Sequence, residues 1–111
     1  MEKRFGKIKS AVFGLGGYQD SMIGLHLDFG GEGWGVSTTK SAWDSNIIKH
    51  TESCQWTEEH RDAQYSDIVR KVSDILKDAK VDSVSKLIGK PVEITFDGTT
   101  LKDWRILTEV I

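Results

Sequence analysis

A glycine-rich stretch near the start of the chain is the first candidate for chemistry, because such loops can cradle phosphate groups. Most of the eleven glycines lie between Gly14 and Gly35. Phosphate-binding loops run from a strand directly into a helix and present the amides of that helix to the anion. Here an alternating apolar strand follows instead, and Gly14–Tyr18 lacks the Lys-Ser/Thr of such loops. The stretch therefore predicts sharply turned antiparallel β-structure rather than phosphate chemistry.

Histidine and cysteine side chains are the second candidates, as metal ligands. His50, Cys54 and His60 are separated by short intervals, and Glu52 lies between the first two. Structural zinc sites pair ligands two to four residues apart in two clusters, and only the His50–Cys54 spacing fits that pattern. We therefore expect no metal, no cofactor and a small structural thiol at Cys54.

A cysteine–histidine nucleophile is the third option. Cys54 precedes the start of a predicted helix, whose dipole would favour the thiolate. Glu52, Glu58 and Glu59 oppose this effect with negative charge, and no residue that would orient a histidine can be identified from spacing. The sequence thus predicts a protein that is not an enzyme.

Two arginines have alternative interpretations. Arg61 continues the apolar stripe of the predicted long helix, so its guanidinium must reach solvent, pair with a carboxylate or hold an anion. Arg105 follows Trp104 near the Asp97-Gly98 turn and invites the same interpretations. We favour ion pairs for both and keep anion binding as the alternative.

Four aromatic residues lie in or beside predicted turns and an irregular middle segment. They are Tyr18, Trp34, Trp43 and Trp56. Aromatics on a sheet can stack on single-stranded bases, but that mode also requires a basic groove. Most of these rings are expected to cover the core, and any that are exposed are expected to anchor a protein partner.

The composition limits the classes of function. The chain has 111 residues, a formal net charge of −2 and one cysteine. A single domain over residues 1–111 is expected. The charge gives no footprint for duplex DNA, and no window is long and apolar enough for a membrane span. Residues 1–4 do not lead into an apolar signal segment. These features predict a cytoplasmic protein.

The periodicities predict an α+β fold. Apolar residues at Ile23, Leu25, Leu27 and Phe29 alternate as in a half-buried strand. Helical spacing runs through Tyr65, Ile68, Val69, Val72, Ile75, Leu76 and Ala79. The expected order is βββ-α-ββ, a mainly antiparallel five-stranded sheet with one long helix packed across it. The elements are strands at 5–13 (Ile8 and Val12 inward), 22–29, 34–38, 92–96 and 104–111, and a helix at 58–80; residues 39–56 show no clear period and are expected to form a loop.

The last predicted strand is apolar on both faces. Trp104, Ile106 and Val110 would lie on one face, and Leu107 and Ile111 on the other. A strand of this kind is either central or covered by another chain. We therefore predict a homodimer with Leu107 and Ile111 at its interface.

Three stretches resemble a family of small hypothetical proteins encoded by tailed bacteriophages and prophages. They are FGLGGYQDSMIGL (13–25), CQWTEEHR (54–61) and KPVEITFDGTTLKDWRILTEVI (90–111). The family carries no established activity, so no functional residue can be transferred from it. The resemblance implies a phage-encoded accessory protein in the host bacterial cytoplasm, where such proteins often inhibit host defences.

These observations favour a non-enzymatic protein that binds and inhibits or modulates a bacterial host protein, as an anti-CRISPR or a similar anti-defence inhibitor would. The alternative is a small-ligand binder that sequesters a signalling nucleotide. In both cases loops on a rigid scaffold are expected to carry the site. The predicted binding residues are Tyr18, Gln19, Asp20, Trp34, Trp43, Trp56, Arg61 and Arg105.

Overall fold

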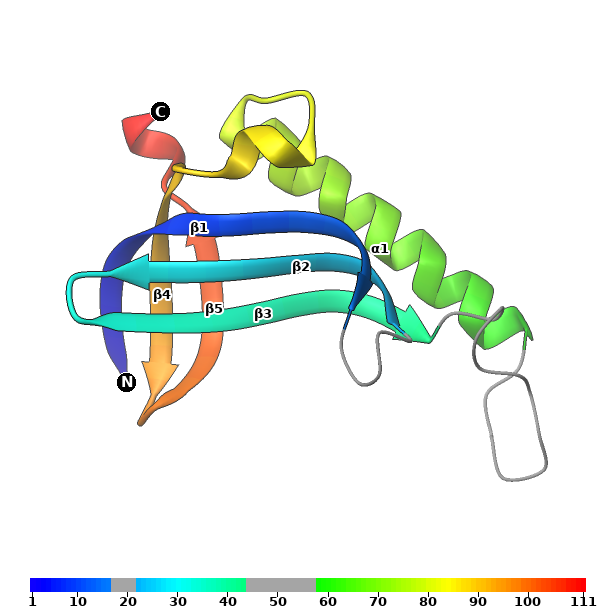
Figure 1. The fold of residues 1–111 in the computed structure, drawn as a ribbon, viewed down its shortest axis with the longest axis horizontal. Helices are drawn as coiled ribbons and strands as arrows, with labels where there is room; N and C mark the ends of the chain where they lie inside the picture. Colours follow the sequence, from blue (N-terminus) through cyan, green and yellow to red (C-terminus); the bar gives the residue numbers. More distant parts are fainter. Residues whose placement is uncertain (17–21, 44–57) are drawn as a thin grey trace.

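A computed structural model of the chain describes residues 1–16, 22–43 and 58–111. It contains a five-stranded antiparallel sheet and one long helix, in the predicted βββ-α-ββ order (Figure 1). The α+β prediction is therefore confirmed. The strands are β1 (Glu2–Gly16), β2 (Met22–Gly31), β3 (Trp34–Trp43), β4 (Pro91–Asp97) and β5 (Thr100–Ile106); the helices are α1 (Glu58–Ala79) and the 3-10 turns η2 (Val84–Leu87) and η3 (Thr108–Val110).

The sheet has the order β3-β2-β1-β4-β5, and β1 joins its two halves. The first part of β1, Glu2 to Lys7, pairs with β4, whereas the part from Lys7 to Gly16 pairs with β2. The strands of the two halves cross in the view of Figure 1. The sheet folds over so far that Phe29 of β2 contacts Trp104 of β5, with ring centroids 4.8 Å apart. One sheet thus encloses most of its own core.

A β-bulge makes the bend in β1 and corrects one prediction. The pairing with β2 shifts between Ile8 and Ser10, so Lys9 is an extra residue. An extra residue reverses the inward and outward alternation of everything after it. Ile8 is fully buried as predicted, but Ala11 then points inward and Val12, predicted to be inward, is about half exposed at 53%.

The helix α1 packs against β3, β2 and β5. Its buried stripe holds Ile68, Ile75 and Ala79, as its spacing predicted, whereas Val69 lies outside the stripe and is 63% exposed. The helix ends with Lys80 in the left-handed conformation, at φ 57°. The amide of Val81 donates to the carbonyl of Leu76 at 3.0 Å, which closes the last turn.

Several strand boundaries differ from the predictions: β1 runs from Glu2 to Gly16 rather than over 5–13, and β5 begins at Thr100 rather than at 104. The strand β3 continues to Trp43, so the first part of the predicted 39–56 loop is strand paired with β2. At the other end of the chain β5 ends at Ile106, and Thr108–Val110 forms a 3-10 turn. The predicted strand at 104–111 was therefore wrong after Ile106. Its partner β4 begins at Pro91, whose carbonyl accepts from the Leu107 amide at 3.0 Å, so no partner backbone remains beyond that point.

No helix among the described residues has the length and apolar character needed to cross a membrane.

Candidate functional site

The second half of β1 is the most exposed apolar part of the sheet. Val12, Phe13 and Leu15 are 53%, 48% and 49% exposed. Phe13 and Leu15 lie on the core side of the sheet, because they stand opposite Leu25 and Ile23 in the β1–β2 register. Val12 stands opposite His26, on the outer face. This stretch therefore presents apolar side chains on both of its faces.

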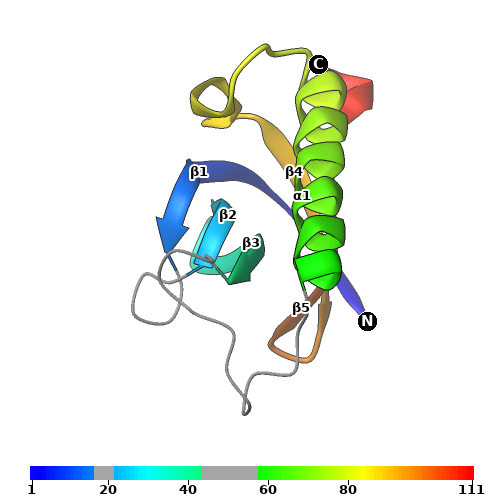
Figure 2. The same cartoon turned by 90° about the vertical axis from the view of Figure 1, so that its right-hand side faces the viewer.

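This stretch is also an edge. The backbone of Ile8 makes the last bonds on the β4 side, accepting from the Gly89 amide at 2.8 Å and donating to the Lys90 carbonyl at 3.0 Å. Within the described ranges, no strand pairs with the remaining residues of β1 on that side. Figure 2 shows the end of β1 on the far side of β2 and β3 from α1. We call the segment from Ser10 to Gly16 the open edge.

The outer face beside the open edge carries a polar network. Ser10 donates to the carboxylate of Asp28 at 2.7 Å, and Ser37 donates to its other oxygen. These hydrogen bonds lower the pKa of Asp28 below its ordinary value, against a smaller opposing effect of burial. Ser10, Asp28 and Ser37 stand side by side on β1, β2 and β3, so the network joins the three strands across one row of paired residues.

His26 lies in the next row of the same face. Its Nε2 is 3.3 Å from the carbonyl oxygen of Gly14, and its Nδ1 is 3.1 Å from the hydroxyl of Thr39. A side chain at Gly16 would meet the imidazole ring at 2.9 Å. The ring therefore covers Gly16, which leaves no room for a side chain at that position. His26 and Asp28 belong to different rows, and no hydrogen bond among the described residues joins the His26 ring to the Asp28 carboxylate.

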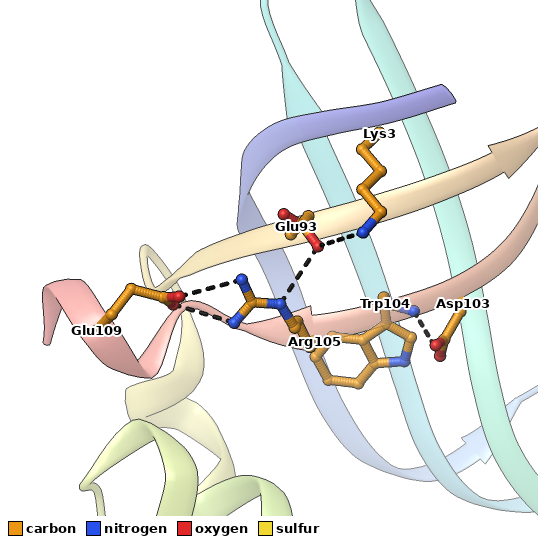
Figure 3. Close-up of polar contacts among 6 residues, drawn as sticks. All are labelled: Lys3, Glu93, Asp103, Trp104, Arg105 and Glu109. Atoms are coloured by element: carbon orange, nitrogen blue, oxygen red, sulfur yellow. Dashed lines mark hydrogen bonds and ion pairs between the residues drawn. The ribbon is translucent and has the colours of Figure 1, made fainter. Parts of the chain in front are cut away.

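Arg105 forms ion pairs rather than an anion site. It donates to Glu93 at 3.2 Å and forms a bidentate pair with Glu109 at 3.0 and 3.1 Å (Figure 3). Lys3 lies 3.8 Å from the same Glu93 carboxylate. Hydrogen bonds to Glu109, the larger effect, and to Glu93 raise the pKa of Arg105. The hydrogen bonds from Arg105 lower the pKa of Glu109. The network ties β1, β4 and β5 to η3, and the ion-pair interpretation of Arg105 is the one that the geometry supports.

Three other predicted site residues lie within the described part of the chain. Trp34 is half-buried and packs edge-on against Phe96 at 5.6 Å, so it covers the core. Arg61 is half-buried, with its guanidinium carbon 6.0 Å from the centre of the Tyr65 ring. Trp43 closes β3 opposite Met22. Tyr18, Gln19, Asp20, His50, Glu52, Cys54 and Trp56 lie outside the described residues.

Leu107 and Ile111, the predicted dimer interface, are each half-buried within the protomer. Ile111 packs against the core. Because β5 ends at Ile106, Leu107 and Ile111 do not belong to a strand that is apolar on both faces. The reason for placing them at a dimer interface is therefore removed. Self-association itself stays a prediction.

Sequence reasoning missed the open edge, although a signal for it was present. Val12, Phe13 and Leu15 place apolar side chains on both faces of one strand, which is the criterion that was applied to residues 104–111. The bulge at Lys9 hid it, because a strict alternation from Ile8 assigns Val12 to the core. No group of three or more metal-ligating side chains occurs among the described residues.

Comparisons of the chain with models of protein families, with curated proteins and with solved structures gave no match.

Proposed function

We propose that this protein acts by binding rather than by catalysis, and that its partner is another protein that contributes an extended segment to the open edge. The observation that supports this most directly is the combination of unpaired strand backbone with three half-exposed apolar side chains. An unpaired edge offers a row of amides and carbonyls to an incoming strand, and alternate side-chain contacts supply selectivity. The segment from Ser10 to Gly16 contains no proline and no charged residue that would block such pairing.

The resemblance to phage proteins suggests the class of partner. A bacterial defence or regulatory protein, met in the host cytoplasm, would be inhibited or modulated when its own extended segment is captured. The polar network around Asp28 holds β1 against β2 and β3, so the edge is presented on a rigid sheet. Such preorganisation reduces the entropic cost of binding.

Lysine substitutions at the open edge test this proposal. Tagged parent protein and the Phe13→Lys and Leu15→Lys variants would be purified from phage-infected bacteria and their co-purifying proteins compared. We expect one host protein to be captured by the parent and lost with both variants, because a charged side chain cannot be buried against an incoming strand without a large cost. Val69→Lys is the matched control, since Val69 is also an exposed apolar residue, at 63%, and lies on α1 rather than on the open edge.

Two results would contradict the proposal. One is a captured protein that is lost equally with Val69→Lys, or retained by all variants. The other is sedimentation showing that the parent alone is a dimer and that Phe13→Lys alone makes it monomeric. In that case a second copy of the chain occupies the edge.

A further inference from the structure

A cleft of about 470 Å³ lies where the two edges of the folded sheet approach the helix. Thr38, Thr39 and Lys40 of β3 line one side of it, and Lys102, Asp103 and Trp104 of β5 line another. Lys71 and Ile75 of α1, with Leu25 and Leu27 of β2, complete the lining. The strand β1 contributes no residue to the lining.

The rim of this cleft is cationic. Three lysines line it, one each from β3, α1 and β5, against the single carboxylate of Asp103. That carboxylate accepts a hydrogen bond from the backbone amide of Trp104 at 2.8 Å. Within the part of the chain that the structure describes, none of the three lysines forms an ion pair. In a protein with a net charge of −2, these lysines form a local concentration of positive charge.

The register of the strands explains why two of these lysines are directed to the cleft. Lys40 stands opposite Leu25, which faces the core, so both lie on the concave side of the sheet. In β5 the pairing with β4 shifts between Thr95 and Phe96, which makes Lys102 the extra residue of a bulge. Bulges of this kind commonly redirect a side chain beside a functional site.

The floor of the cleft is apolar and includes a tryptophan. Trp104 is half-buried, packs on Phe29 at 4.8 Å and has the ammonium of Lys71 at 5.7 Å from its ring centre. Leu25, Leu27 and Ile75, which are all buried, surround it. An aromatic ring with adjacent aliphatic side chains can receive a planar base, and Thr38, which stands opposite the buried Leu27, adds a polar group at one side.

We propose that this cleft binds a nucleotide, with its phosphates on the lysines and its base against Trp104. Lysine is a common phosphate ligand, and a cleft of this volume lies in the range of small-molecule sites. The proposal does not use the open edge, because no residue from Ser10 to Gly16 lines the cleft. Each can therefore fail without affecting the other.

The test uses adenosine diphosphate as the probe, titrated into the full-length protein by calorimetry at low salt. We expect saturable binding that weakens with added salt, and at least about tenfold weaker binding for each of Lys71→Ala and Lys102→Ala, which corresponds to the loss of one charge-assisted contact. Lys77→Ala is the matched control, because Lys77 lies on α1 and is exposed but does not line the cleft. Its affinity should equal that of the parent.

Two further probes separate the phosphate contacts from the base contact. Pyrophosphate should bind more weakly than adenosine diphosphate, and adenosine more weakly still. The indole NMR signal of Trp104 can be assigned because it disappears in the Trp104→Phe variant. Binding of adenosine diphosphate should shift that signal in the parent protein. No binding at millimolar concentration, equal weakening by Lys77→Ala, or pyrophosphate binding as tightly as adenosine diphosphate would overturn the assignment.

Discussion

The two halves of β1 belong to one strand but have opposite surfaces. The first half, from Glu2 to Lys7, pairs with β4 and carries charges, and Lys3 joins the ion-pair network of Glu93 and Arg105 (Figure 3). Phe5 is its one large exposed apolar residue. The second half, after the bulge, exposes three apolar side chains along an unpaired edge.

The difference shows that one strand can be charged and paired with β4 in its first half, and apolar and open on that side in its second half. Charged side chains prevent an edge from pairing with another chain. The first half is rich in them, whereas Ser10 to Gly16 has none. The exposed ion pairs contribute little to stability. An edge left apolar in the same strand is then a candidate for a retained function.

The largest expected effect comes from the residue at the junction of the two halves. Ile8→Ala removes a fully buried side chain and should lower the free energy of unfolding by about 3 kcal/mol. Val12→Ala, four residues further along the strand, should cost less than about 1 kcal/mol because Val12 is half exposed. Urea unfolding of both variants measures the contrast. Equal losses would show that Val12 is packed as tightly as Ile8, and the open edge would then not exist.

The next largest effect concerns a glycine in each half. A Cβ at Gly6 would lie 2.5 Å from the Gly30 carbonyl oxygen and 2.8 Å from the Trp34 ring, so Gly6→Ala should destabilise the fold by about 2 kcal/mol through overpacking. At Gly14 the nearest atom would be Val12 Cγ1 at 3.8 Å. Gly14→Ala should therefore be neutral or stabilise by about 0.5 kcal/mol. Thermal unfolding would distinguish the pair, and a loss at Gly14 as large as that at Gly6 would mean that the second half is crowded.

The smallest effect is a pH dependence in the second half. The Ser10 and Ser37 hydrogen bonds lower the pKa of folded Asp28, so they stabilise the fold at pH values above the unfolded pKa. This stabilisation is lost as the pH falls through the folded pKa. Ser10→Ala should raise the pKa of Asp28 toward its ordinary value, as measured by NMR titration of the carboxyl group.

The difference in stability between parent and Ser10→Ala should then be present at neutral pH and vanish in strong acid, where Asp28 is protonated in both. Ser85→Ala, remote from Asp28, serves as the control and should leave the titration unchanged. An unaltered pKa in Ser10→Ala would contradict the role of this hydrogen bond in holding β1 to β2.

Local patterns in the sequence were sufficient for the elements and their order. The helical spacing from Ile68 to Ala79 predicted α1, and the alternation from Leu25 to Phe29 predicted β2, because burial on one side of a helix or strand imposes its period on the sequence. Gly98, at φ 63°, forms the turn expected from Asp97-Gly98. The absence of a charged residue from Ser10 to Gly16 was equally visible in the sequence.

Only the tertiary structure decided the features that depend on a partner strand. The bulge at Lys9 changed which side of β1 faces the core, and the start of β4 at Pro91 set the end of β5. Lys40, Lys71 and Lys102 come from three elements far apart in the chain and meet only because the sheet folds over toward α1. Sequence periodicity reports burial along one element at a time, so contacts between distant elements, and the sites they form, require the fold.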